Sequence, residues 1–259
     1  MASNDSIKKT LLVAVLLCAV CSVIVSTAAV MLKPAQVANK ALDFNRNILL
    51  AAGLLEEGVS VEEQFKQVTA KLVDMETGRF VTVEEAGVTA LDSYDMRKAS
   101  KDAALAIELD GADDIAKIKR QAKVAKVYLI EKNGKVEKVI LPVHGYGLWS
   151  TMYGFLALES DLNTVVGLGF YEHGETPGLG GEIDNPKWKA VWPGKKVYGS
   201  DGGVALSVVK GAATPGSTHD VDGLSGATLT SRGVHNLIQF WLGENGYAPF
   251  LAKLKRGEA

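Results

Sequence analysis

Long apolar runs and shorter alternating runs divide this chain into segments with different expected structures. Residues 11–32 form 22 consecutive positions without a charge, rich in Val, Leu, Ile and Ala. At a rise of about 1.5 Å per residue, a helix of this length reaches about 33 Å, enough to cross a hydrocarbon core of about 30 Å. The pattern predicts a transmembrane helix over residues 11–32, preceded by a cytoplasmic tail over residues 1–10.

A cleaved signal peptide is the competing interpretation of this segment. Lys8 and Lys9 precede the apolar run, and residues 26–28, Ser-Thr-Ala, resemble a small-residue cleavage site. The run is longer than the usual apolar region of about 7–15 residues, which favours an uncleaved anchor. Basic residues flank both ends of the run, so the charge bias does not decide its orientation. Because the N-terminal tail is short, we expect it to stay in the cytoplasm and the large remainder to lie outside.

Apolar residues then recur at roughly helical spacing. Val37, Leu42 and Ile48 predict an amphipathic helix that ends at Gly53. Residues 60–63, Ser-Val-Glu-Glu, have a capping-box pattern that begins a second helix. The apolar positions of this second helix are Phe65, Val68 and Leu72. We therefore expect a mostly helical, membrane-proximal region over residues 33–115.

From residue 116 the apolar positions alternate as they do in strands. Residues 124–131 and 136–143 flank Asn133-Gly134, a common signal for a tight hairpin turn. Residues 152–158, 165–171 and 204–209 are further predicted strands. The fold class is therefore expected to be α+β, with a mixed or antiparallel sheet flanked by helices in a domain over residues 116–259.

Charge and cysteine usage exclude several classes of function. The formal net charge is −2 and no basic block is present, which argues against a nucleic-acid partner. Cys18 and Cys21 both lie in the apolar run, where packing between small residues is their simplest role. The rest of the chain has no cysteine and hence no disulfide or thiolate metal site of its own. The four histidines lack metal-ligand spacing, so no metal site is predicted.

The first motif with chemical content covers residues 222–228, Asp-Gly-Leu-Ser-Gly-Ala-Thr. An apolar-periodic run that includes Val234 and Leu237 follows it, so a helix is expected to begin near residues 228–231. Free N–H groups at a helix start stabilise a phosphate, and Arg232 would add a positive charge. An ordinary helix cap is the alternative. The candidate residues of this motif are Asp222, Ser225, Gly226, Ala227 and Thr228.

The second motif covers residues 173–182, His-Gly-Glu-Thr-Pro-Gly-Leu-Gly-Gly-Glu. Pro177-Gly178 predicts a turn, so one interpretation is a long surface turn. The other is the edge of a ligand site. In that case Thr176 and the backbone amides offer hydrogen bonds, and Leu179 offers an apolar surface to a flat ring.

In this order the two motifs resemble the D-x-x-S/T-G-A-T signature and the E-T-P-G-L-G segment of covalently flavinylated FMN-binding domains. With the N-terminal span, the whole chain resembles the C-subunit family of bacterial sodium-translocating NADH:quinone reductases. The resemblance implies FMN held by a phosphoester to Thr228. It also implies that a separate magnesium-dependent flavin transferase attaches the FMN outside the cytoplasm, using FAD. Further residues implied near the flavin or its phosphate are Glu175, Thr176, Leu179, Leu148, Trp149 and Lys210.

The resemblance also implies a function in a bacterial inner-membrane complex, with the large domain in the periplasm. The chain would relay electrons from an iron–sulfur centre between two membrane subunits to the FMN of the B subunit. Its partners would be the A, B, D, E and F subunits, especially B, D and E, and it would have no complete activity alone. The NADH, quinone and sodium sites would lie elsewhere, and no catalytic side chain is expected in this chain.

Three alternatives remain open on sequence. The G subunit of the Rnf ferredoxin:NAD oxidoreductase shares both motifs, but the long segment before residue 115 and Gly-Gly-Glu-Ile at 180–183 favour the quinone reductase. A non-catalytic anchored binding module would use residues 225–228 only as a helix cap. A freestanding reductase would need its own acid and base groups, and only Glu175 and His173 stand out.

Overall fold

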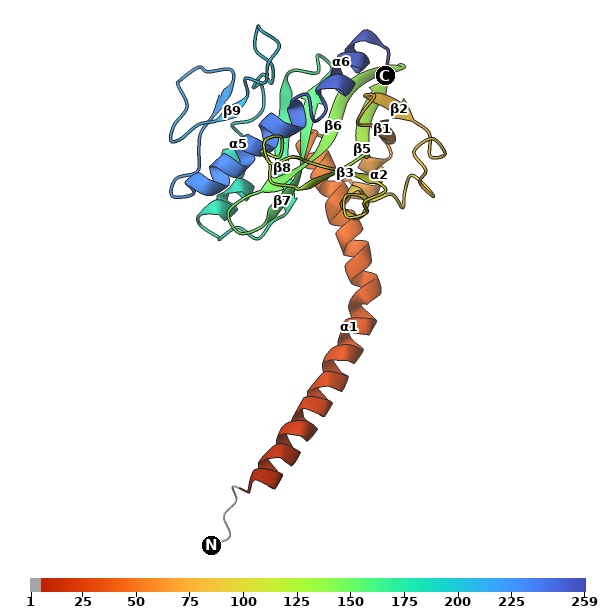
Figure 1. Cartoon of the computed structure of the whole chain (residues 1–259), viewed down its shortest axis with the longest axis vertical. Coiled ribbons are helices and arrows are strands. Elements are labelled where there is room, and N and C mark those ends of the chain that lie inside the picture. The colour runs from red at the N-terminus through yellow and green to blue at the C-terminus, as the bar shows by residue number, and fades with distance from the viewer. Residues whose placement is uncertain (1–5) are drawn as a thin grey trace. The chain divides into compact units, whose positions relative to one another are not determined.

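The computed structural model describes residues 6–259, which divide into two units with the boundary between Phe44 and Asn45. From Ile7 to Phe44 the first unit is part of the long helix α1 (Ile7–Ala51), shown from red to orange in Figure 1. Within the described residues this is the one helix long and apolar enough to cross a membrane, with a mean hydropathy of 2.7 in its most apolar window. The predicted span therefore lies inside a longer helix.

The sequence predicted two helices here, a span over residues 11–32 and an amphipathic helix ending at Gly53, and this division is wrong. Pro34 lies inside α1, which continues to Ala51. A proline removes one backbone hydrogen bond and costs about 3 kcal/mol in a water-exposed helix. Membrane helices tolerate proline where neighbouring groups, ordered water or a local adjustment of the helix satisfies the freed backbone groups.

The second unit is built on a six-stranded antiparallel sheet in the order β2-β1-β5-β6-β7-β8. The four strands predicted between residues 124 and 171 are confirmed as β5, β6, β7 and β8. Asn133 and Gly134 both have positive φ, as the tight turn between β5 and β6 requires. The strands of this sheet are β1 (Val68–Asp74), β2 (Arg79–Val81), β5 (Val124–Lys132), β6 (Lys135–Tyr146), β7 (Thr151–Glu159) and β8 (Val165–Glu172).

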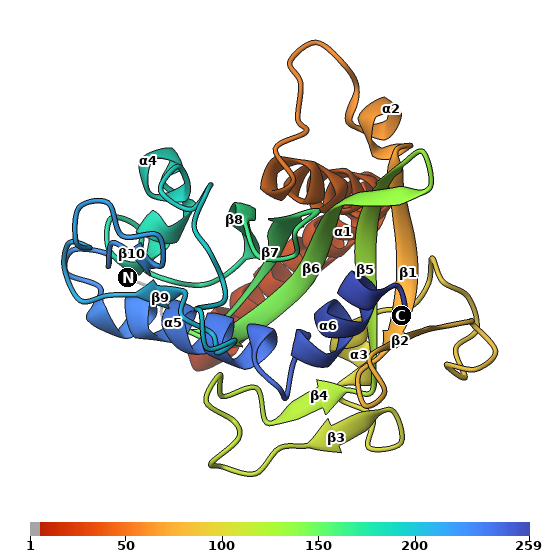
Figure 2. The same cartoon turned by 90° about the horizontal axis from the view of Figure 1, so that it is seen from above.

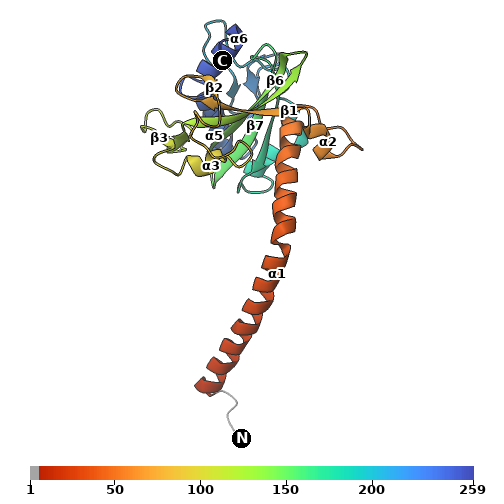
Figure 3. The same ribbon diagram turned by 90° about the vertical axis from the view of Figure 1, so that its right-hand side faces the viewer.

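The expectation of mostly helical structure over residues 33–115 is also wrong. Ser60 does cap a helix, but α2 (Val61–Phe65) is a single turn and the chain then enters β1. Val68 pairs with Ile130 of β5, so this region and the remainder of the domain share one sheet rather than forming separate units. The described elements that follow before residue 115 are β2, the single-turn helix α3 (Met96–Ala99) and the short strand β3 (Ala106–Glu108). Figure 3 shows β3 and α2 on opposite sides of the domain.

Helices α5 (Thr228–Leu242) and α6 (Ala248–Arg256) enclose the main core against the sheet, as Figure 2 shows. Burial of one face of α5 confirms the helix predicted from the apolar spacing. Trp241 Nε1 donates to the carbonyl of His144 (2.7 Å), and the Tyr247 hydroxyl donates to the carbonyl of Pro142 (2.9 Å). These bonds fix the end of α5 and the start of α6 on β6.

The segment after β8 is irregular and forms one wall of the site described below. It contains the 3-10 helix η1 (Gly180–Asp184), α4 (Pro186–Lys189) and the parallel pair β9 (Ser207–Val208) and β10 (Asp220–Val221). The strand expected over 204–209 is thus reduced to two residues. A separate antiparallel pair joins β3 to β4 (Arg120–Ala122) outside the main sheet, as Figure 2 shows.

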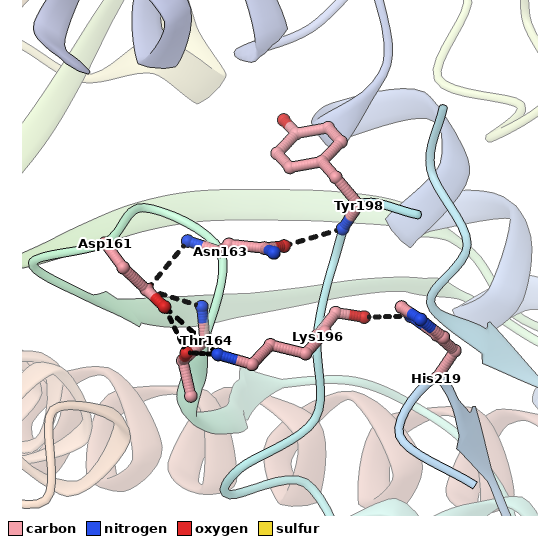
Figure 4. Close-up of polar contacts among 6 residues, drawn as sticks. All are labelled: Asp161, Asn163, Thr164, Lys196, Tyr198 and His219. Atoms are coloured by element: carbon pink, nitrogen blue, oxygen red, sulfur yellow. Dashed lines mark hydrogen bonds and ion pairs between the residues drawn. The ribbon is translucent and has the colours of Figure 1, made fainter. Parts of the chain in front are cut away.

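A polar network fastens this irregular segment to the turn between β7 and β8 (Figure 4). The Asp161 carboxylate accepts hydrogen bonds from the Thr164 N–H (2.7 Å) and hydroxyl (2.5 Å) and from Lys196 Nζ (3.1 Å). The backbone carbonyl of Lys196 accepts from Nδ1 of His219 (2.8 Å). Because His219 immediately precedes β10, the network helps to hold the β9–β10 pair in place.

We expect Asp161→Asn to lower the free energy of unfolding by about 1–2 kcal/mol, because it weakens several hydrogen bonds to a charged acceptor. Burial raises the pKa of Asp161, but its hydrogen bonds lower it more, so the pKa lies well below its ordinary value. The stabilisation is therefore present above the unfolded pKa of about 4 and is lost as pH falls below it. Urea unfolding at pH 7 and at pH 3 measures the difference in free energy of unfolding between the variant and the unmutated protein. The exposed Asp113→Asn is the control, and an equal loss at both pH values would contradict the prediction.

Candidate functional site

The Glu175 carboxylate lies buried where three segments of the second unit meet. Its Oε1 accepts hydrogen bonds from the backbone N–H groups of Leu148 (3.1 Å), Trp149 (2.9 Å) and Ser150 (3.3 Å). Its Oε2 accepts the hydroxyl proton of Thr230 (2.6 Å). One charged side chain therefore joins the β6–β7 loop, the 173–182 segment and the first turn of α5.

This hydrogen bonding keeps the carboxylate ionised in spite of its burial. Burial alone raises the pKa of Glu175, but the hydrogen bonds from the Thr230 hydroxyl and the three N–H groups outweigh it, so the pKa is lowered. Two glycines make the close approach possible. A Cβ at Gly147 would lie 2.6 Å from Oε1, and one at Gly180 would lie 2.8 Å from Oε2.

The β6–β7 loop presents two apolar side chains to solvent while its backbone faces Glu175. Leu148 is 39% exposed and Trp149 is 66% exposed, although both donate N–H groups to the buried carboxylate. The Ser150 hydroxyl accepts a hydrogen bond from the Gly174 N–H (2.6 Å), which ties the loop to the second motif. The structure thus brings the predicted residues Leu148, Trp149 and Glu175 together.

The second motif forms a tight turn whose apolar side chain reaches the first motif. The carbonyl of Thr176 accepts hydrogen bonds from the N–H groups of Leu179 (3.1 Å) and Gly181 (2.9 Å). Leu179 is 46% exposed, and its Cδ2 lies 3.2 Å from the position of a Cβ on Gly226. The two predicted motifs are therefore neighbours, and an exposed apolar side chain lies beside residues 225–228.

Thr228 is the first residue of α5 and is exposed. Ala227 occupies the N-cap position and no side chain caps the helix, so residues 225–228 do not act as the ordinary cap considered above. The early N–H groups of a helix have no partners within it and carry the positive end of its dipole. The Thr228 hydroxyl therefore lies at a helix start that favours an anion.

Asp222 holds the preceding loop rather than facing the same pocket as Thr228. Its Oδ1 accepts a hydrogen bond from the Ala213 N–H (2.7 Å), and its carbonyl accepts one from Trp188 Nε1 (2.8 Å). Trp188 in turn packs edge to face on Trp192. Asp222 thus fixes the 210–213 turn relative to the start of α5.

A pocket of about 280 Å³ opens beside Thr228. Lys210 and Arg232 contribute positive charges to its lining, and no acidic side chain lines it. The predicted residues Thr228 and Lys210 are therefore brought together. The lining consists of residues 207–211, residues 223–224 and the α5 residues Thr228, Ser231, Arg232 and His235.

Sequence reasoning did not assign site positions to Ser207, Thr230, Ser231 and His235. The α5 residues at positions 231, 232 and 235 follow Thr228 by three, four and seven residues, a spacing that places them on one helix face and was available from the sequence. Thr230 points to Glu175 instead, and Ser207 reaches the pocket through the β9–β10 pairing. No local sequence pattern predicts either of these two contacts.

This geometry is that of a flavin-binding domain, and residues 147–243 match the family model of the FMN-binding domain. The C subunit of the Na(+)-translocating NADH-quinone reductase of Pseudomonas aeruginosa is 54% identical over the full length of both chains. The corresponding C subunit of Vibrio vulnificus is 53% identical over 99% of each chain. The crystal structure of Shewanella oneidensis NqrC matches with a TM-score of 0.77 at 36% identity, covering 85% of this chain and 99% of that chain.

The chain therefore belongs to the C-subunit family of Na(+)-translocating NADH-quinone reductases, which decides against the G-subunit alternative. As a member, it is a subunit of an oxidoreductase complex and contains an FMN-binding domain. The residues present fit that cofactor. Two cationic side chains without an acidic neighbour suit its phosphate, and exposed Leu148, Trp149 and Leu179 suit an isoalloxazine ring.

We expect Glu175→Gln to lower the free energy of unfolding by about 2–3 kcal/mol at pH 7, since hydrogen bonds to a buried charge are lost. Because the pKa of Glu175 is lowered, its stabilisation disappears as pH falls below about 4, and the variant then approaches the unmutated protein. Hydrogen exchange at Leu148 and Trp149 should also become faster. Denaturant unfolding and amide exchange measure these effects, with exposed Glu57→Gln as the control. Unchanged exchange in the β6–β7 loop would contradict this role.

Proposed function

We propose that this protein carries FMN covalently, through a phosphoester on the Thr228 hydroxyl, as an electron-transfer subunit of the quinone reductase. The observation that carries the proposal is the position of Thr228, exposed at the start of α5 and on the edge of a pocket lined by Lys210 and Arg232. When bound, FMN supplies one-electron and two-electron chemistry. The chain supplies the attachment point, the charges around the phosphate and the apolar loops.

The residues of this chain divide into three roles in the proposal. Lys210, Arg232 and the first N–H groups of α5 hold the phosphate by charge and hydrogen bonding. Leu148, Trp149 and Leu179 contact the flat ring. Glu175 does not react. It fixes the loop of Leu148 and Trp149 against α5, and Asp222, Ser225, Gly226, Ala227 and Thr176 shape the backbone around the attachment point.

The family of the chain supports a more specific place in electron transfer. Electrons would arrive from an iron–sulfur centre between the D and E subunits and leave to the FMN of the B subunit. A flavin held by a phosphoester keeps an unmodified isoalloxazine, so the attachment works as a tether. The exposure of Leu148, Trp149 and Leu179 would leave a ring bound to them accessible to redox partners.

Attachment at Thr228 predicts a flavin that survives denaturation. When the chain is coexpressed with its flavin transferase, its band on a denaturing gel should fluoresce, and Thr228→Val should abolish the fluorescence because the attacking hydroxyl is missing. Thr214→Val, at another exposed threonine, should keep it. Fluorescence that persists in Thr228→Val, or is missing from the unmutated chain, rules the attachment site out.

We further propose that α1 anchors the protein with its second unit in the periplasm. Two observations support the anchor: the family of the chain, and α1 as the one helix within residues 6–259 that is long and apolar enough to cross a membrane. Alkaline phosphatase fused after Ala259 should then be active, because that enzyme folds only outside the cytoplasm, and a β-galactosidase fusion at the same point should be inactive. The opposite pattern would place the domain in the cytoplasm.

A further inference from the structure

The pocket beside Thr228 has more positive charge than one ester needs and no acidic side chain to balance it. Within residues 6–259, neither the Lys210 nor the Arg232 side chain makes a hydrogen bond or ion pair. Both side chains are exposed and point to the same concavity. Two unbalanced cations at one pocket favour an anionic ligand.

The pocket also extends well beyond Thr228. Its α5 lining runs to His235, seven residues on, which corresponds to about 10 Å along a helix axis. The volume of about 280 Å³ has room for several water molecules, each of which takes about 30 Å³ in the liquid. A single phosphoryl group at Thr228 would therefore leave the far end of the pocket vacant.

With the ring placed as in the proposed function, neither the ring nor the ribityl chain that joins it to the phosphate accounts for that remaining space. The exposed apolar side chains that suit the ring are Leu148, Trp149 and Leu179, and none of them lines the pocket. Leu179 instead contacts Gly226, on the loop that leads into α5. The pocket and the apolar side chains are thus two separate neighbours of Thr228.

The chemistry of attachment calls for a second phosphoryl group at this point. A hydroxyl that attacks a phosphate monoester must expel hydroxide, whereas one that attacks a diphosphate ester expels a phosphate, a far better leaving group. The Thr228 oxygen forms the new bond to phosphorus, the bond from that phosphorus to the bridging oxygen breaks, and the leaving phosphate takes the electron pair. The hydroxyl proton passes to solvent, and nothing is oxidised or reduced. Positioning and charge neutralisation dominate catalysis of such transfers.

We propose that the pocket lined by Lys210, Arg232 and His235 receives the leaving phosphate of a flavin diphosphate ester while the cofactor is attached to Thr228. This inference rests on the proposed attachment site. It makes the acceptor chain a participant in its own modification, because its cations neutralise the charge that develops on the leaving group.

His235 supplies a neutral hydrogen-bonding group at the far end of the pocket. Burial lowers the pKa of His235, so the imidazole is uncharged near pH 7. Its Nδ1 lies 3.3 Å from the Ser207 hydroxyl, and within residues 6–259 no partner engages Nε2. His235→Gln keeps an amide near the Nε2 position, whereas His235→Asn keeps only the contact with Ser207.

Ligand binding to the unloaded full-length protein, made without the transferase and kept in detergent, tests the pocket. Calorimetry should show that inorganic pyrophosphate binds more tightly than inorganic phosphate. Lys210→Gln and Arg232→Gln should each weaken pyrophosphate at least about tenfold, the effect of losing one hydrogen bond to a charged group. Lys255→Gln and Arg79→Gln, at exposed positions elsewhere, should leave binding unchanged. Equal binding of the two anions, or unchanged binding in both pocket variants, overturns the proposal.

The rate of attachment gives a second, independent readout. With transferase and flavin dinucleotide supplied, in-gel fluorescence should appear about tenfold more slowly in Lys210→Gln and Arg232→Gln. His235→Gln should be faster than His235→Asn. Unchanged rates in all four variants, with flavin still attached at Thr228, would refute the pocket's role and leave the attachment site intact. Fluorescence on Thr228→Val would instead refute the attachment site itself.

Discussion

The Glu175 carboxylate is a buried charge that four donors from two distant segments satisfy, and the arrangement of the site depends on it. A buried carboxylate without such donors would be strongly destabilising. The β6–β7 loop must therefore turn its N–H groups inward, and this leaves the Leu148 and Trp149 side chains outside. The same carboxylate takes the Thr230 hydroxyl, so it fixes the first turn of α5 and with it the position of Thr228.

A second constraint acts from the opposite wall of the pocket. Residues 207–211 belong to an irregular segment whose β9 and β10 strands have only two residues each. Such short pairing is weak by itself. The Asp161–Thr164–Lys196 network shown in Figure 4 compensates for it. The contacts of Asp222 with Ala213 and Trp188 add to this support. Lys210 is thereby held opposite α5 without a long strand behind it.

These two constraints give Thr228 different neighbours on its two sides. The exposed Leu179 side chain, from the segment that carries Glu175, lies beside the loop that leads into α5, and a basic pocket runs along the helix. A planar apolar ring joined to an anionic phosphate has the same division of properties. The polarity of the site therefore suits the cofactor whose binding domain the chain contains.

The sequence by itself determined the strands between residues 124 and 171, the Asn133-Gly134 turn, helix α5 and the two motifs, because each is set by local periodicity or turn chemistry. Local spacing failed at Val68 and Leu72. Residues four apart share a face in a helix and also in a strand. The spacing of Val68 and Leu72 therefore fits both structures, and the pairing of β1 with β5 makes this segment a strand. Tertiary structure alone brought Thr230 to Glu175, and Lys210 and Ser207 to Thr228. Those contacts join residues that are distant in the sequence, and they form because a buried charge and the unpaired edges of short strands must be satisfied.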